Sequence, residues 1–401
     1  MKSVSLPLFS EAKAATEKPQ GWPFLRLGFR PFYVGAALVA ALLVPLWLLL
    51  FLGHTVVTPA VPGLLWHAHE MLFGFAATVV IGFLMTAGKN WTGLATPRGP
   101  LLGALALLWL AARVAALGSS PWLYAALDFA LLPIIALIFA RLLLRARNHR
   151  NLPLAGILSL LALANGVFHL AANGVVDISP LTPLYAGLAL ITLIECVIGG
   201  RVIPAFTMAA NPGLRLVASP AVERLALGLT AAGLLLWVIA PPNPLTALSL
   251  LAAGVAQGWR LAGWRSALTV GKPILWILHA AYAWVPVALA LLALAQLGWV
   301  SPSVGVHALA LGATGGLIIG MMTRTARGHT GRPLVVSKAE VLAYGLVLAA
   351  ALVRVIGALL PAAVYPMSLM LAATAWSLAF GIYLVKYTPW LLQTRLDGKD
   401  G

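Results

Sequence analysis

Long apolar stretches, broken by short groups of proline, glycine and basic residues, cover almost the whole chain. A helix that crosses a bilayer needs about 20 predominantly apolar residues. On this basis residues 31–389 predict a bundle of twelve transmembrane helices, and this even number places both termini on the same side of the membrane. The expected spans are residues 31–53, 66–88, 100–117, 122–144, 153–173, 180–203, 220–240, 244–262, 273–296, 301–323, 337–359 and 363–389. The pattern therefore predicts an all-α membrane protein with a single polytopic domain over residues 1–401.

The composition excludes the main alternatives to a membrane protein. Of the 401 residues, 61% are hydrophobic and 9% are charged, whereas about a quarter of the residues in soluble domains are charged. A soluble enzyme and a disordered chain are both excluded by these values. The net charge of +16 would suit a nucleic-acid-binding protein, but such a protein needs a basic patch on a water-exposed domain, which this pattern does not contain. We therefore expect a lipid bilayer around the chain and no nucleic acid.

The basic residues predict the orientation. If residues 1–30 form a cytoplasmic segment and residues 390–401 a cytoplasmic tail, all of the 26 Lys and Arg except Arg113 and Arg354 fall on the cytoplasmic side. Cytoplasmic loops of multi-pass proteins carry such an excess of positive charge. We therefore expect both termini to be cytoplasmic.

The second and tenth spans contain the same residues at a constant offset of 238 positions. The matched residues are His69 and His307, Gly74 and Gly312, Ile81-Gly82 and Ile319-Gly320, and Thr92-Gly93 and Thr330-Gly331. Prolines that open the first, fifth and ninth spans (Pro31, Pro153 and Pro273) recur at a spacing of about 120 residues. These matches predict three four-helix units in a pseudo-threefold arrangement. The alternative is that Ile-Gly and Pro recur by chance in an apolar sequence.

Histidines gather where the spans are expected to reach the outer face. Polar side chains inside a membrane usually mark a functional site, and neutral imidazole is a good ligand for iron and copper. His69 and His307 are equivalent in the repeat, so we expect them to ligate a haem between them, with Gly74 and Gly312 leaving space for the porphyrin.

Arg113 and Arg354 lie at a similar expected depth. Because arginine pairs well with carboxylates, both are candidates to bind the haem propionates. The alternative is that they extend to the outer lipid headgroups.

His67 is separated from His69 by about 200° around a helix, so the two cannot face one ligand plane. We expect His67 to join His169 in a second metal site, with His54 as a weaker candidate. The alternative is hydrogen bonding to backbone carbonyls or interfacial water. Spacing alone does not decide which of His67 and His69 binds iron, but the repeat favours His69.

Three acidic residues, Glu70, Asp128 and Glu195, lie inside expected spans. Glu70 follows His69 and could orient a ligand imidazole. Glu195 lies near the midplane of its span and could relay protons, although a neutral acid hydrogen-bonded to the backbone is the alternative. Glu70 and Glu195 are therefore the candidate catalytic residues.

Four segments together resemble the NnrS family, haem- and copper-containing membrane proteins linked to nitric oxide in bacteria. They are residues 28–32 (GFRPF), 66–71 (WHAHEM), 201–204 (RVIP) and 307–332. The resemblance implies one or two b-type haems, copper as a candidate second metal, and a location in the bacterial inner membrane. It also implies a role in nitric oxide metabolism or protection against nitrosative stress.

The expected architecture is also similar to that of the catalytic subunit of haem–copper oxidases and nitric oxide reductases. That superfamily takes copper ligands from its sixth and seventh helices, but the corresponding spans here contain no histidine. The tenth span has one histidine where two are usual. A copper site of that type is therefore not expected.

These features favour an oxidoreductase that reduces or scavenges nitric oxide with electrons from membrane quinol. Protons would travel along polar residues such as Glu195. The alternative is a non-enzymatic haem- or copper-binding sensor, or a transporter of a metal or a small nitrogen species. Transporters bind their substrates near the midplane, whereas the polar residues here gather at one face, which favours a cofactor site.

Overall fold

The structure is a computed structural model that describes residues 21–55, 57–118, 120–217 and 219–400. The described residues form helices and no strands. Residues 1–20 of the expected cytoplasmic segment 1–30, and Gly401 of the expected tail, lie outside them.

The first half of the chain contains short helical turns and longer helices. They are η1 (Pro23–Leu25), α1 (Phe29–Phe51), α2 (Gly63–His69), η2 (Glu70–Ala76), α3 (Ala77–Thr92), α4 (Gly99–Ala115), α5 (Pro121–Arg145), η3 (His149–Asn151), α6 (Leu152–Ala172) and α7 (Leu181–Ala210). The second half continues with α8 (Pro220–Ile239), α9 (Pro244–Ala262), η4 (Ser266–Thr269), α10 (Pro273–Gln296), α11 (Pro302–His307), η5 (Ala308–Gly315), α12 (Gly316–His329), α13 (Lys338–Gly357), η6 (Ala362–Val364) and α14 (Tyr365–Leu391).

Ten helices of the described chain are long and apolar enough to cross a membrane. The all-α membrane fold is therefore confirmed. The two other expected spans also form helices, α4 with 17 residues and α9 with 19, but neither is among these ten. The count of twelve spans and the pseudo-threefold arrangement stay predictions.

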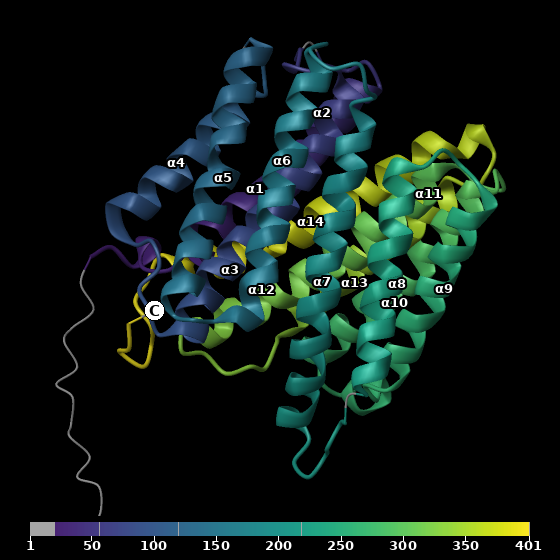
Figure 1. The fold of residues 1–401 in the computed structure, drawn as a ribbon. Helices are drawn as coiled ribbons and strands as arrows, with labels where there is room; N and C mark the ends of the chain where they lie inside the picture. Colours follow the sequence, from purple (N-terminus) through teal and green to yellow (C-terminus); the bar gives the residue numbers. More distant parts are fainter. Residues whose placement is uncertain (1–20, 56, 119, 218, 401) are drawn as a thin grey trace, which may run out of the picture.

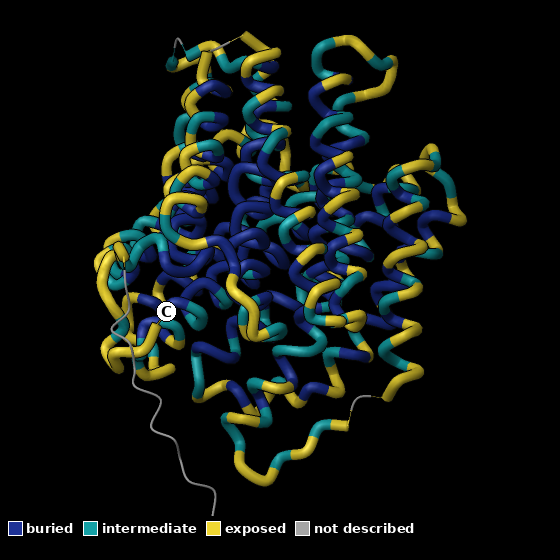
Figure 2. Tube along the Cα trace, turned by 60° about the vertical axis from the view of Figure 1, so that its left-hand side comes forward, coloured by how far each residue is buried: buried dark blue, intermediate teal, exposed yellow. Residues whose placement is uncertain are grey.

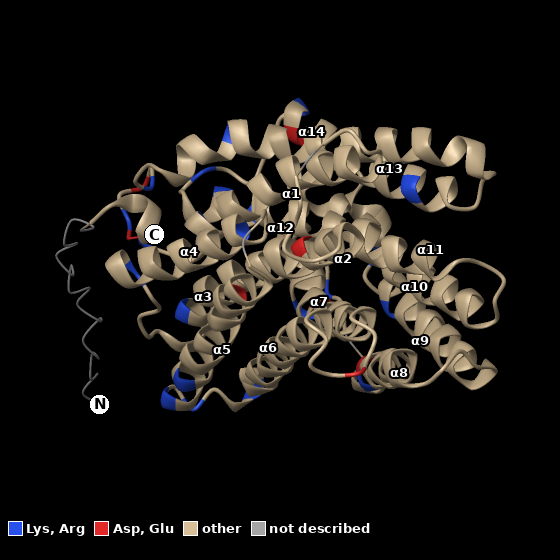
Figure 3. Cartoon of the chain, turned by 90° about the horizontal axis from the view of Figure 1, so that it is seen from above, with Lys and Arg blue, Asp and Glu red and all other residues tan. Residues whose placement is uncertain are grey.

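Helices that follow one another along the chain mostly pack side by side, and α14 returns to pack against α1 (Figure 1). Most of the ribbon carries no charged residue (Figure 3), as expected for helices that lie in lipid. Prolines at the first turn of α5, α8, α9 and α10 fit helix starts, because proline lacks the N–H that would be unpaired there.

Two helical rods form the interior of the bundle. The rod α2–η2–α3 is 89% buried over its most apolar stretch and the rod α11–η5–α12 is 72% buried, whereas α8 is 28% buried. Figure 2 shows the buried positions gathered at the centre of the molecule. These inner rods are the second and tenth expected spans, the two related by the repeat.

Both inner rods widen into a π-helical segment directly after the matched histidine. Segment η2 begins one residue after His69, and η5 begins one residue after His307. π-Helical insertions are rare and are frequent at functional sites. The relation between the two rods therefore extends from sequence to backbone conformation.

The matched glycines leave room for protein side chains. A Cβ at Gly74 would lie 2.6 Å from Nη1 of Arg113, and a Cβ at Gly312 would overlap the ring of Trp284. Arg113 and Trp284 thus lie against these glycines, and space for a porphyrin there stays a prediction.

Candidate metal centre

The last residue of α2, His69, points into a buried polar cluster between α2, α5 and α6. Its Nδ1 lies 2.6 Å from the Tyr124 hydroxyl. Its Nε2 lies 2.8 Å from Oδ1 of Asn165 and 3.2 Å from Oδ2 of Asp128. The ring is fully buried, and both of its nitrogen atoms contact protein groups.

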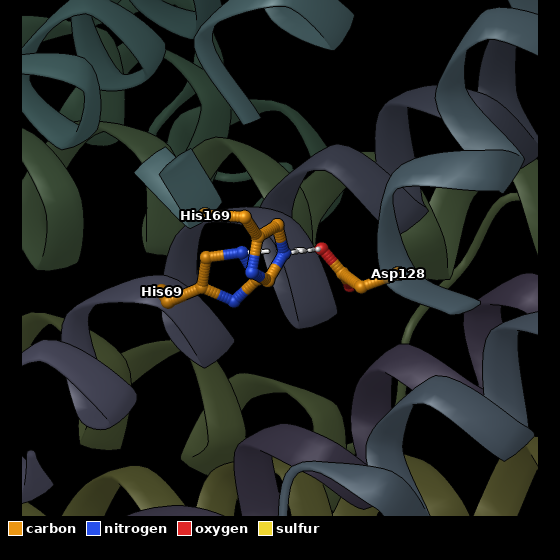
Figure 4. A group of neighbouring side chains, drawn as sticks. All are labelled: His69, Asp128 and His169. Atoms are coloured by element: carbon orange, nitrogen blue, oxygen red, sulfur yellow. Dashed lines mark hydrogen bonds and ion pairs between the residues drawn. The ribbon is translucent and has the colours of Figure 1, made fainter. Parts of the chain in front are cut away.

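His169, near the end of α6, completes the cluster. Its Nε2 donates a hydrogen bond to Oδ2 of Asp128 at 2.9 Å. The ligand atoms of His69, Asp128 and His169 all lie within 4.8 Å of one another, and Figure 4 shows both rings facing the carboxylate. This buried group could hold a metal ion.

Arg113, at the end of α4, holds the two acidic residues of the cluster. One Nη donates to Glu70 Oε2 at 2.8 Å and the other pairs with Oδ1 of Asp128. Arg113 is 6% exposed, so it does not extend to the lipid headgroups. Its Nη atoms are paired with protein carboxylates in place of the haem propionate expected from the sequence.

The charges of the cluster do not cancel. Glu70 and Asp128 supply two carboxylates, and Arg113 supplies one guanidinium. With neutral imidazoles the cluster therefore carries one excess negative charge. Since an uncompensated charge is costly in a buried site, the cluster favours an additional cation.

The hydrogen bonds lead to the same conclusion. Three contacts form a line: Glu70 Oε1 to the Tyr124 hydroxyl at 2.9 Å, that hydroxyl to His69 Nδ1, and His69 Nε2 to Asn165 Oδ1. The amide of Asn165 is oriented by its donation to Asp128 Oδ2 at 2.7 Å. The Tyr124 hydroxyl and a neutral His69 imidazole together supply two donor protons, whereas three hydrogen bonds would need three. A further proton or a metal ion would complete the line.

The structure therefore brings together four of the residues singled out in the sequence: His69, Glu70, Arg113 and His169. It adds Asp128, which the sequence placed inside a span without a role, and Tyr124 and Asn165, which sequence reasoning missed. An acidic residue in an apolar span was a usable signal for Asp128. Nothing local distinguishes Tyr124 or Asn165.

His67 lies outside this cluster, whereas the sequence analysis expected it beside His169. Its ring stacks on Trp47 with 4.0 Å between ring centroids. His69 instead lies beside His169, at 5.2 Å between centroids. The two histidines of α2 thus face different neighbours, as their separation around the helix requires.

His307 and Arg354, the other two expected haem-binding residues, are linked through Ser303. The Nδ1 of His307 lies 2.7 Å from the Ser303 carbonyl oxygen, and Nη2 of Arg354 donates to the Ser303 hydroxyl at 3.2 Å. The structure does not place His307 against His69, whose ring nitrogens contact Tyr124, Asn165 and Asp128.

Glu195 lies on α7. Its Oε2 accepts a hydrogen bond from Thr314 at 3.1 Å. Its side chain lines an apolar cavity of about 70 Å³ between α1, α3, α7, α10 and α12. It is thus a single carboxyl group in an apolar wall.

The family model described as NnrS protein matches residues 23–395. This match confirms the resemblance seen in the sequence. A search among curated proteins finds no match.

Proposed function

Because the chain belongs to the NnrS family, a group of nitric oxide-related membrane proteins, we propose that it reduces or scavenges nitric oxide at a metal centre formed by His69, Asp128 and His169. Electrons would come from membrane quinol, and the cell would gain protection against nitrosative stress. The observation that carries this proposal is the buried donor set of two imidazoles and one carboxylate with one excess negative charge.

The donor set suits a first-row transition metal. Imidazole binds iron and copper well, and a carboxylate adds the negative charge that a divalent ion requires. A bound iron or copper ion would supply a redox-active centre able to bind nitric oxide. Asn165 and Arg113 both contact Asp128 and would hold the ligand carboxylate in place.

The Glu70–Tyr124–His69 line would supply protons beside the metal. Reduction of two nitric oxide molecules to nitrous oxide and water consumes two electrons and two protons. Tyr124 donates to Glu70 and contacts His69, so a proton can move along this line by short transfers. Glu195 remains a candidate relay further along the bundle, at the wall of its apolar cavity.

The same reasoning leads to the proposed location of the protein, its second redox group and its electron donor. The protein would lie in the bacterial inner membrane with both termini in the cytoplasm, and b-type haem would be a second redox group. Quinol is proposed as the electron donor because the apolar helices give it access from the bilayer.

The test is turnover by the purified full-length protein. Reduced quinol and nitric oxide are supplied and nitrous oxide is measured, together with the metal content. We expect turnover in the wild type, loss of turnover and metal in His169→Ala, and full retention of both in His149→Ala, an exposed histidine in η3.

Equal rates for wild type and His169→Ala would contradict the proposal. Nitric oxide binding without nitrous oxide would instead support a sensor.

A further inference from the structure

We propose that His67, His307 and Arg354 form a second cofactor site, separate from the metal centre, for a metal chelate that carries an acidic group. A haem, with its iron and two propionates, has this chemistry. The inference deepens the proposed function, because it assigns the residues that would bind the second redox group. It rests on buried polar atoms that lack partners among the described residues.

Arg354, on α13, is a buried cation without an acidic partner in the described chain. It is 6% exposed, and its Nη1 is buried without a hydrogen-bond partner. Its Nη2 donates to two neutral groups, the Ser303 hydroxyl at 3.2 Å and the Tyr365 hydroxyl at 3.1 Å.

Three other buried arginines of the described chain are neutralised by carboxylates. Arg113 pairs with Glu70 and Asp128, Arg260 with Glu223 and Arg327 with Glu340. A charge buried in a membrane protein is strongly unfavourable unless it is paired. The buried guanidinium of Arg354 therefore favours an anionic group supplied by a ligand.

His307 has the hydrogen-bonding state of a metal ligand. Its Nδ1 donates to the Ser303 carbonyl oxygen at 2.7 Å, which leaves the lone pair on Nε2. No described residue forms a hydrogen bond with that Nε2. Metal-ligating histidines are commonly fixed in this way, with one ring nitrogen on a backbone carbonyl and the other free to coordinate.

His67 supplies a second imidazole. Its Nδ1 is buried and has no hydrogen-bond partner in the described chain, while its ring is held against Trp47. A buried ring nitrogen without a partner indicates a missing ligand.

These groups belong to one site. His67 and His307 both lie close enough to Arg354 for its charge to act on their rings. Ser303 contacts both Arg354 and His307. A ligand that carries both a metal and an acidic group would satisfy the imidazole nitrogens and the Arg354 Nη1 that have no partner in the described chain. The sequence repeat favoured His69 as the partner of His307, but the surroundings favour His67.

The test measures haem per protein and the reduced absorption spectrum of the purified full-length chain. Loss of a group that only supports a metal ligand commonly costs about 10- to 100-fold in affinity, so removal of the ligand itself in His67→Ala or His307→Ala should lose most of the haem. His69→Ala and the control His149→Ala should retain it. Haem retained by His67→Ala or His307→Ala but lost by His69→Ala would overturn the assignment, as would a wild-type protein without haem.

Two further variants separate ligation from a structural role. His307→Gly with added imidazole should regain the wild-type spectrum, and failure in a protein that elutes like wild type would overturn the proposal. Arg354→Gln should lower the haem midpoint potential and weaken haem retention, whereas Arg354→Lys should preserve most of both. A potential unchanged in Arg354→Gln would contradict the pairing with an acidic group.

These measurements distinguish a failure of the haem-site assignment from a failure of the proposed function. Haem lost only in the His67, His307 and Arg354 variants, together with no nitrous oxide formation, would support this site and refute nitric oxide reduction.

Discussion

The two histidine clusters of this protein contain histidines at matched positions of two similar segments but differ in charge. His69 and His307 occupy equivalent positions, and each is followed by a π-helical segment. The residue after His69 is Glu70, which pairs with Arg113, whereas the residue after His307 is Ala308. An arginine lies near each histidine, but only the first has carboxylate partners among the described residues.

This difference changes what each cluster can bind. The first cluster has one excess negative charge and its described contacts lack one proton, so it favours a cation. The second has a buried guanidinium without a carboxylate partner among the described residues, so it favours an anion. A shared backbone therefore supports opposite ligand preferences, because the neighbouring side chains set the charge.

The largest effect is expected from Asp128→Ala. The change leaves Arg113 with one carboxylate and removes a candidate metal ligand. Breaking a buried ion pair costs about 3–5 kcal/mol, so the melting temperature in detergent should fall strongly and the metal should be lost. Asp177→Ala, at an exposed position, is the control, and an equally small shift in both variants would refute this reading.

Ala308→Glu gives the second cluster the acidic residue of the first. We expect the new carboxylate to pair with Arg354 and to compete with the acidic group of the ligand, which should lower haem retention by about tenfold or more. Haem per protein is measured against Ala308→Gln, which has similar size but no charge. Equal retention in both variants would indicate that Arg354 does not bind an acidic group.

Glu70→Gln removes the excess negative charge from the first cluster while keeping the size of the side chain. The affinity for a divalent metal should fall by about tenfold, close to 1.4 kcal/mol. Competition titration with a metal-binding dye measures the change. Glu195→Gln, on the wall of a separate cavity, should leave this affinity unchanged, and a similar loss in both variants would contradict the charge argument.

The smallest effect is expected at the C-terminal ion pairs outside the spans. Partial burial disfavours the charged form of Asp400, but Lys89 and Arg98 outweigh it and lower the pKa of that carboxyl group. Its contribution is therefore present above the unfolded-state pKa and is lost as the pH falls through the folded-state pKa.

Because the ion pairs of Asp400 with Lys89 and Arg98 are partly exposed, they should contribute less than about 1 kcal/mol to the free energy of unfolding. Melting temperatures of wild type and Asp400→Asn should differ slightly at neutral pH and converge in acid. A difference as large as that of Asp128→Ala would contradict the contrast between surface and buried pairs.

The sequence by itself determined the membrane fold, because each span depends only on a local run of apolar residues of sufficient length. It also identified the histidines, acids and arginines that are costly inside a membrane, and the constant offset that relates His69 to His307. These properties are local or periodic, so they can be read without knowing which helices meet.

Only the tertiary structure decided the partners of these residues. The separation of His67 and His69 around α2 excludes a common ligand plane, but the contacts of the His69 ring with residues of α5 and α6 place His69 in the cluster with Asp128. Tyr124, Asn165 and Ser303 gained a role only through contacts between distant helices. Partner choice depends on the rotation and depth of each helix, which the packing of many side chains sets jointly and which no single apolar run specifies.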